Sequence, residues 1–231
     1  MSDSISLSLD LLKDTYNYNH WIYSFLRPFI GNVVFEVGAG TGNLTRFFLP
    51  VEKLYCLEPD PAFCALLKKL AAVHLNMTVI EESLEAYCLK QSVQQIDTVV
   101  CVNVLEHISD DFDAVQKMAN LLKPGGKLLL YVPATTWAYG AIDKNLGHYR
   151  RYSKHRLINI AAESKLRVRR IKHVNFIGAF GWWWSSRVCK EKDIAPEKAR
   201  LVDRFVPYLS AFERIFPMPV GQSIFAALEK T

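Results

Sequence analysis

The chain lacks the features that mark membrane-spanning, secreted or disordered proteins. None of its apolar stretches approaches the ~18 residues that a membrane-spanning helix needs. The N-terminal residues 1–6 have no basic region followed by an apolar core, as a secretory leader would, and no low-complexity linker or internal repeat follows. We therefore expect a cytoplasmic protein, and its 231 residues, 50% of them hydrophobic, support one sizeable core.

Cysteine is sparse and unpatterned. The five cysteines are scattered, and no Cys-x-x-Cys pair indicates zinc binding or dithiol chemistry; they are Cys56, Cys64, Cys88, Cys101 and Cys189. Most lie inside apolar segments, so we interpret them as small core residues. Cys189, in a less apolar setting, is the alternative candidate for a reactive thiol, although no neighbouring residue supports that role.

Charge is distributed unevenly. Residues 1–147 hold 11 Lys/Arg and 16 Asp/Glu, a net charge of −5, whereas residues 148–231 hold 17 and 7, a net charge of +10. A basic C-terminal third suits an anionic substrate, a nucleic acid or a membrane surface. A solvated basic face on helices explains the same asymmetry without any ligand.

The most informative segment is Val33–Gly42, an apolar strand that runs directly into closely spaced glycines. Gly38, Gly40 and Gly42 permit a tight turn and a close approach of backbone to a ligand. The dinucleotide fingerprint places its third glycine one residue later, so this chain departs from that pattern.

Two glutamates accompany the glycine turn. Glu36 lies inside the strand, two residues before the first glycine, and Glu58 ends the next apolar run, where a doubly wound fold places an acid that binds ribose hydroxyls. A carboxylate at position 36 suits a cationic ligand better than a pyrophosphate. Together the two acids indicate a nucleoside that carries positive charge.

Five segments, in order, resemble the motifs of class I S-adenosylmethionine-dependent methyltransferases. They are Glu36–Gly42, Leu57–Asp60, Val79–Leu84, Ile96–His107 and Leu121–Lys127. The resemblance covers roughly residues 16 to 175, and the order of the segments makes it far more specific than one glycine motif.

Alternating strand and helix signals predict an α/β fold, a Rossmann-like, seven-stranded, mostly parallel sheet with helices on both faces. We expect a single domain, residues 1–231. Its parts are an N-terminal helical cap (1–30), a cofactor-binding core (31–175), a helical, Trp-rich insertion or lid (176–222) and a last strand (223–231). In the family, strand seven follows strand six after a short turn, so the long insertion leaves its position open.

The resemblance implies where S-adenosylmethionine binds. Glu36, Gly38, Ala39 and Gly40 would surround the methionine portion of the cofactor, and Glu58 and Pro59 would contact the ribose. Glu82, Ser83 and Leu84 would contact the adenine, and Asn103 and Val104 would line the sulfonium side. Tyr18 of the N-terminal cap would lie over the mouth of the site. Glu82 could instead be a surface acid at a strand end.

The segment 103–107 bears on the chemistry. It lacks the prolines and aromatic residue that the resemblance would require for nucleobase N-methylation, and it is closer to ubiquinone-biosynthesis O-methyltransferases. Some of those enzymes bind a divalent cation with an acid and a Glu-His pair. Asn103 replaces that acid, so we expect no metal. His107 is a candidate general base, with a structural histidine as the alternative.

A second polar cluster follows the fifth strand. Gly147–Tyr152 resembles the Gly-His-x-Arg-Arg-Tyr segment of a bacterial subgroup of these methyltransferases. Here we expect His148 as the first-choice catalytic base, with Tyr149 beside it. Arg150 or Arg151 would bind an anionic part of the acceptor, and Asp143 is a further candidate for contact with substrate. Alternatively, Arg151 and Tyr152 fasten the loop through acids such as Asp143.

The insertion contains Trp182, Trp183 and Trp184, which cannot all face one core, and an amphipathic segment from Leu201 to Phe216. We expect Trp182 to contact substrate. The amphipathic segment suits core packing, a homodimer, a lid over an apolar acceptor, or peripheral contact with a membrane.

The sequence thus predicts a methyltransferase that uses S-adenosylmethionine, yields S-adenosylhomocysteine and methylates a small, partly hydrophobic, anionic acceptor at oxygen. The alternatives are an NAD-dependent oxidoreductase or epimerase and a non-catalytic scaffold that binds the cofactor. Methylation of nucleic acid is a weaker alternative.

Overall fold

A computed structural model describes residues 15–90, 95–191, 196–216 and 218–231. Its centre is one seven-stranded sheet in the order β3-β2-β1-β4-β5-β7-β6. The strands are β1 (Val33–Val37), β2 (Lys53–Leu57), β3 (Met77–Ile80), β4 (Ile96–Val102), β5 (Leu122–Pro133), β6 (Leu166–Val174) and β7 (Ser223–Lys230). The first five are parallel, and β7 lies antiparallel between β5 and β6.

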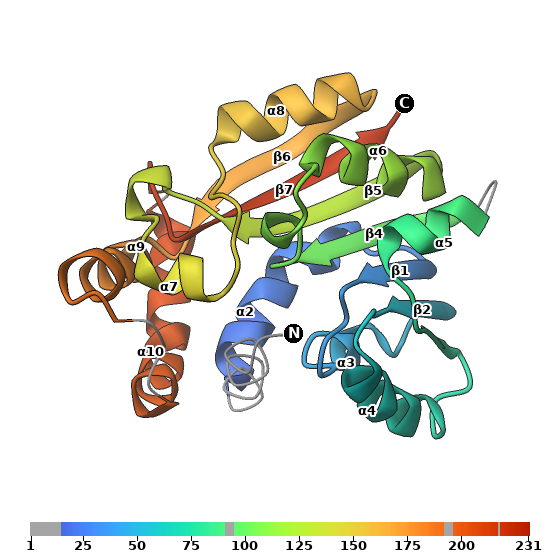
Figure 1. Cartoon of the computed structure of the whole chain (residues 1–231), viewed down its shortest axis with the longest axis horizontal. Helices are drawn as coiled ribbons and strands as arrows, with labels where there is room; N and C mark the ends of the chain where they lie inside the picture. Colours follow the sequence, from blue (N-terminus) through green and yellow to red (C-terminus); the bar gives the residue numbers. More distant parts are fainter. Residues whose placement is uncertain (1–14, 91–94, 192–195, 217) are drawn as a thin grey trace.

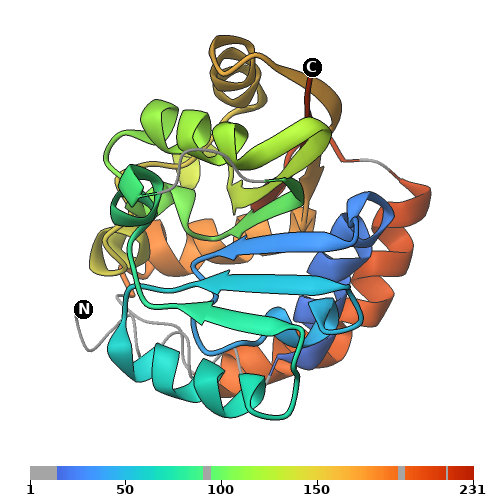
Figure 2. The same ribbon diagram turned by 90° about the vertical axis from the view of Figure 1, so that its right-hand side faces the viewer.

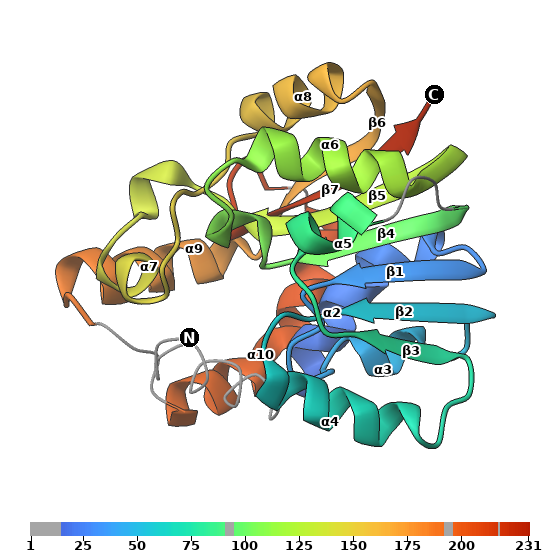
Figure 3. The same cartoon turned by 45° about the vertical axis from the view of Figure 1, so that its right-hand side comes forward.

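Helices cover both faces of this sheet (Figures 1 and 3). One face carries α5 (Leu84–Lys90), α6 (Asp111–Leu121) and α8 (Lys154–Glu163); the other carries α2 (Tyr16–Leu26), α3 (Thr45–Phe48), α4 (Pro61–Ala71) and α10 (Pro196–Ile215). The helices α7 (Ala141–Asn145) and α9 (Phe176–Trp183) lie beyond the carboxyl ends of the central strands, and the π-helical turn η4 (Trp184–Val188) extends α9.

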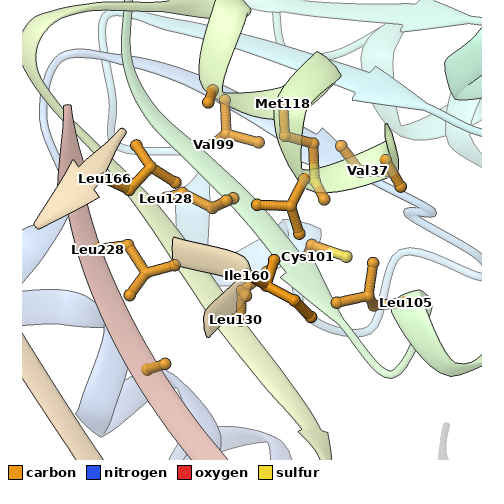
Figure 4. Packing of buried hydrophobic residues seen from close by; sticks show 14 of the residues in the cluster. Val37, Val99, Cys101, Leu105, Met118, Leu128, Leu130, Ile160, Leu166 and Leu228 are labelled. Carbon is orange, nitrogen blue, oxygen red and sulfur yellow. The ribbon is translucent and has the colours of Figure 1, made fainter. Parts of the chain in front are cut away.

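Two hydrophobic clusters hold these layers together. Along β1 the side chains alternate, so that Phe35 and Val37 face α5 and α6, whereas Val34 packs with Trp21 and Leu26 of α2. Figure 4 shows the first cluster, in which Met118 of α6 and Ile160 of α8 pack against Val99, Leu128 and Leu228 of the sheet. The parallel strands are buried on both sides, as their continuous apolar sequences predict.

The predicted fold class is confirmed by the seven-stranded sheet with helices on both of its faces. The open question about the last strand is answered by β7, which pairs with β5 from Ser223 to Glu229 and with β6 from Ser223 to Lys230. It can reach that position because the insertion leaves and re-enters the sheet at one place: Gln222 N–H donates to the Asn175 carbonyl. Figure 2 shows the strands with helices packed on either side. Residues 1–14 of the expected N-terminal cap lie outside the described residues.

Candidate active site

The turn after β1 forms the floor of a pocket at the carboxyl edge of the sheet. Gly38, Gly40 and Gly42 have φ angles of 71°, 54° and 82°, in the region that favours glycine. A Cβ added to Gly38 would lie 2.4 Å from Cγ2 of Val104 on the opposite wall. The turn therefore leaves room that any other residue would fill, and it borders a cavity of about 490 Å³. That volume is typical of small-molecule and cofactor sites.

Two buried glutamates line this cavity. Glu36 accepts a hydrogen bond from Thr45 Oγ1 at 2.6 Å, and burial raises its pKa to about 7. Glu58 accepts hydrogen bonds from the backbone N–H groups of Gly40 at 2.8 Å and Asp60 at 2.9 Å, and burial raises its pKa as well. Since a carboxylate offers about four lone-pair sites, Glu58 keeps capacity to accept from ligand hydroxyls. Burial of two carboxylates costs free energy that a cationic ligand would offset.

The other walls come from separate elements. Helix α2 contributes Tyr18, whose hydroxyl lies 3.3 Å from that of Tyr131. The end of β4 contributes Asn103, which has a φ of 52° and donates its backbone N–H to the Tyr131 carbonyl at 2.8 Å. Such a conformation in a residue other than glycine costs energy and is common at ligand sites. Ser83 and Leu84 close the pocket beyond Glu58.

The structure brings eleven of the twelve expected cofactor residues to this pocket. They are Tyr18, Glu36, Gly38, Ala39, Gly40, Glu58, Pro59, Ser83, Leu84, Asn103 and Val104. Glu82 is the exception: it forms an ion pair with Lys90 at 2.6 Å and is not among the residues that line the pocket. Its role at the adenine stays a prediction, and Glu85 lines the pocket as well.

Three titratable side chains gather at the other end of the pocket. His107 lines the cavity, whereas His148 lies behind it, with the two rings edge to face and their centroids 4.7 Å apart. Burial, reinforced by the charge of His148, lowers the pKa of His107 to about 4, so this ring is neutral at pH 7. Glu106 is 1% exposed, burial raises its pKa to about 7, and its Oε2 has no hydrogen-bond partner among the described residues.

Asp143 organises the region behind His107. This carboxylate is fully buried and accepts hydrogen bonds from His148 Nδ1 at 3.0 Å, Arg151 Nε at 2.8 Å, Trp182 Nε1 at 3.1 Å and the Gly140 N–H at 3.0 Å. Burial acts to raise the pKa of Asp143, but these donors outweigh it and leave the pKa below its ordinary value. The ionised carboxylate therefore fixes the orientation of the His148 ring, with Nδ1 donating to Asp143.

These contacts correct four expectations. Arg151 is buried, bonded to Asp143 and to the Ala134 carbonyl, and lies 4.8 Å from the ring centroid of Trp182. Arg150 donates to the carbonyls of residues 108 and 109. Neither arginine lines this pocket, and neither do Asp143 and Trp182; the contacts of all four fasten loops of the described chain to one another. His148, the first-choice base, is likewise set back from the pocket, whereas Tyr149 lines it.

A cation could use the same cluster. One ligand atom from each of Glu106, His107 and His148 lies within 4.8 Å of the others, and this is the group of potential metal ligands found in the part of the chain that the structure describes. The buried, unpartnered Oε2 of Glu106 fits such a role. The expected absence of a metal stays a prediction.

Sequence reasoning missed several residues that line the pocket. Asn19 and Ile22 lie one and four residues beyond Tyr18 on α2. Phe63 lies on α4, the helix that begins shortly after Glu58. A signal existed for Ile22, because residues four apart share a helix face. Phe63 lies on the apolar face of its helix and is only 7% exposed. Nothing in the sequence shows that this face also meets a pocket.

Comparison with known proteins finds that part of this chain is similar to methyltransferases. Residues 35–128 match the family model of a methyltransferase domain. A methyltransferase of Anoxybacillus flavithermus is 33% identical over 102 residues, 43% of this chain and 46% of that protein. A thiol S-methyltransferase of Rattus norvegicus is 33% identical over 99 residues, and a ubiquinone biosynthesis O-methyltransferase of Salmonella newport is 34% identical over 101. The matches to these three relatives span less than half of their length.

Solved structures extend the likeness over nearly the whole chain. A methyltransferase dependent on S-adenosylmethionine from Archaeoglobus fulgidus has a TM-score of 0.62 at 14% identity, covering 92% of this chain and 93% of that one. A geranyl diphosphate methyltransferase in complex with S-adenosylmethionine has a TM-score of 0.59 at 13% identity, covering 90% and 84%. Residues 35–128 thus match the model of a methyltransferase domain, and the chain as a whole has the Rossmann-like fold of these solved structures.

Proposed function

We propose that this protein transfers a methyl group from S-adenosylmethionine to a small-molecule acceptor, at oxygen. The observation that carries the proposal is one pocket, in which a glycine turn between two buried glutamates faces a wall that holds a neutral histidine. The matching domain and the relatives named for S- and O-methylation support the reaction class.

The residues fit the proposed cofactor. The space above Gly38 that a Cβ would fill accommodates backbone contact, Glu36 offers a carboxylate to a cationic tail, and Glu58 offers acceptors to two hydroxyls. When bound there, S-adenosylmethionine would supply an electrophilic methyl group on sulfur and leave as a neutral thioether.

The chain's own contribution is alignment and removal of a proton. We infer that His107 accepts the proton of the acceptor hydroxyl, because it is the neutral ring that lines the pocket. Its low pKa means that it does not retain the proton at neutral pH. Glu106, with a pKa of about 7, and His148, held by Asp143, have polar atoms within 4.8 Å of this ring, so that one bridging water would pass the proton to either of them.

The acceptor should have an apolar body. Ile22, Leu44, Ile108 and Leu146 line the pocket together with the half-exposed ring of Tyr149. We do not propose an anionic acceptor, because the two arginines expected to bind it are hydrogen-bonded to protein groups instead.

Calorimetric titration of the full chain tests the proposal. We expect S-adenosylhomocysteine to bind with micromolar or tighter affinity and NAD to give no heat; the reverse would favour an oxidoreductase. Gly38→Ala should abolish binding, because its Cβ would meet Val104. Gly181→Ala, whose Cβ would meet nothing within 4 Å, is the matched control.

Assays of methyl transfer distinguish the proposed metal-independent enzyme from a non-catalytic scaffold and from a metal-dependent enzyme. We expect methylation of hydroxyl-bearing apolar compounds to survive dialysis against a chelator. Activity that disappears on chelation and returns with a divalent cation would assign Glu106, His107 and His148 to a metal. Tight cofactor binding without turnover on a broad panel of acceptors would favour the scaffold.

A further inference from the structure

Helix α10 buries carboxylates and exposes apolar side chains, which is the reverse of the usual arrangement in a helix that packs on a protein. Its buried stripe contains two carboxylates: Asp203 is 7% exposed and Glu213 is 6% exposed, with Val206 between them at 2%. The carboxylate of Asp203 accepts from the N–H of Tyr18 at 2.8 Å, and that of Glu213 from the N–H of Phe176 at 2.6 Å. Each therefore caps the N-terminus of another helix, α2 or α9, so α10 is attached largely by polar bonds.

The apolar residues of α10 point the other way. Leu201, Phe205, Tyr208, Phe212 and Ile215 are 60%, 53%, 74%, 47% and 70% exposed. Their spacing alternates between four and three residues, which keeps them on one side of the helix; at about 100° per residue they lie opposite the buried stripe. We call these five residues the outer face. Exposed apolar residues in a continuous row are unusual on a soluble surface and mark an interaction site.

The exposed charge beside the outer face is mostly positive. Because Asp203 and Glu213 face inward, every exposed charged side chain from residue 198 to residue 216 is positive, whereas Glu197, one turn before Leu201, is an exposed acid at the start of the helix. Arg204 and Arg214 flank the outer face on the side between it and the buried stripe. A helix of this kind, with aromatic and aliphatic residues beside arginines, suits an anionic, partly apolar, flat surface.

We propose that the outer face of α10 binds the surface of a membrane that contains anionic lipids. A second copy of this chain is the poorer partner, because it would bring one row of arginines against another while both nearby carboxylates are already bonded inside. A bilayer surface accepts the apolar side chains among its acyl chains and the arginines among its headgroups. The helix would lie in the interface, because none of the described helices is long and apolar enough to cross a membrane.

The attachment of α10 connects this surface with the pocket. Asp203 bonds to α2 at Tyr18, and Tyr18 lines the cavity. A second apolar element, α9 with η4, begins at Phe176, whose N–H donates to Glu213. Its η4 turn carries Trp184, which is exposed, and Arg187. The proposal stands on the surface alone and does not depend on methyl transfer.

Co-sedimentation of the full chain with lipid vesicles tests the proposal. Vesicles of phosphatidylcholine with about 30% phosphatidylserine should bind the protein at about 0.1 M salt, and binding should weaken severalfold at about 0.5 M, where charges are screened. Vesicles of phosphatidylcholine alone should bind it at least tenfold more weakly.

Paired variants identify the face. Phe205→Ser with Phe212→Ser should reduce binding at least tenfold, whereas Leu75→Ser with Leu89→Ser, at positions 100% and 86% exposed elsewhere, should not change it. Arg204→Gln with Arg214→Gln should reduce binding about fivefold for each arginine, and Lys53→Gln with Lys69→Gln should have a much smaller effect. All of these side chains are exposed, so the folded protein should tolerate the changes.

The proposal is wrong if the wild-type chain does not bind the anionic vesicles, or if both α10 variants bind as well as wild type. Sedimentation velocity without lipid tests whether a second copy of this chain binds the outer face instead of a membrane. A dimer that Phe205→Ser with Phe212→Ser converts to a monomer, without any vesicle binding, would assign the outer face to a second copy.

Discussion

Glu36 shows at the residue scale how burial changes a side chain's chemistry. Its position after three apolar strand residues is evident from the sequence, but its pKa of about 7 results from its burial in the fold, which outweighs the hydrogen bonds from Thr45 and Cys56 that act to lower the pKa. Arg150 and Arg151 show the reverse case. The sequence places them beside a candidate base, and only the fold reveals that Ile108, Ser109, Ala134 and Asp143 already occupy their donors.

The raised pKa of Glu36 predicts that cofactor binding depends on pH. A cationic tail binds the ionised carboxylate, so binding at pH 6 must first remove a proton that is already absent at pH 8. We expect the affinity for S-adenosylhomocysteine to increase about tenfold from pH 6 to pH 8. Titration calorimetry at several pH values measures it, and in Glu36→Gln the affinity should be lower and nearly independent of pH. An equally steep dependence in that variant would contradict the assignment.

His107 carries the second prediction at this scale. If it accepts the acceptor's proton, His107→Ala should lower kcat by about 10² to 10⁴ while leaving the affinity for S-adenosylhomocysteine within about threefold. Steady-state kinetics and calorimetry on the same preparation measure both quantities. His155→Ala, on the exposed side of α8, is the control. Unchanged turnover in His107→Ala would remove it from the mechanism.

At the scale of elements, α10 shows why the periodicity of a sequence does not determine which face of an amphipathic helix packs against the protein. The pattern of residues 201–216 predicts an amphipathic helix, and that helix exists. Periodicity identifies two faces but does not say which one meets the protein. The structure turns the apolar face outward because the opposite face offers Asp203 and Glu213 to two helix N-termini, and α2 has no side-chain cap of its own.

This attachment predicts a measurable loss of stability. Asp203→Ala leaves the N–H groups of Asn17 and Tyr18 without their acceptor, which should lower the free energy of unfolding by about 1 to 3 kcal/mol. Urea denaturation measures it, and hydrogen exchange should show faster exchange at these two amides. Glu197→Ala, an exposed carboxylate on the same helix, should change neither. Equal effects of the two variants would show that Asp203 does not hold α10.

At the scale of the whole molecule, stability should respond to the buried carboxyl of Glu106. Its folded pKa of about 7 lies above its ordinary value of 4.5, so folding favours the protonated form. Its stabilising contribution is complete below pH 4.5 and is lost as the pH rises through 7, with a total of about 3 kcal/mol. His107 acts in the opposite direction below pH 6.5, because its pKa is lowered to about 4.

A variant isolates the contribution of Glu106. Glu106→Gln keeps the shape but does not titrate, so its Tm relative to wild type should increase between pH 5 and pH 8. Differential scanning calorimetry at several pH values measures the difference, and His107 affects both proteins alike. A difference that does not depend on pH would show that Glu106 is not buried in its neutral form.

The sequence by itself determined the order of strands and helices, the sheet class and the glycine turn between Glu36 and Glu58. These features are local: apolar runs, turn residues and helix caps act between neighbours along the chain, so they can be read without the fold. Eleven of the twelve expected cofactor residues reached one pocket for the same reason, since the carboxyl ends of parallel strands meet at one edge of the sheet.

Only the tertiary structure decided which polar groups remain available for chemistry. His107 rather than His148 lines the pocket, Asp143 is occupied by four donors, and β7 lies between β5 and β6 after a long insertion. Each of these outcomes depends on contacts between residues far apart in the chain. Hydrogen-bond partners and burial arise from packing in three dimensions, and a buried donor is satisfied by whichever acceptor the fold brings within reach.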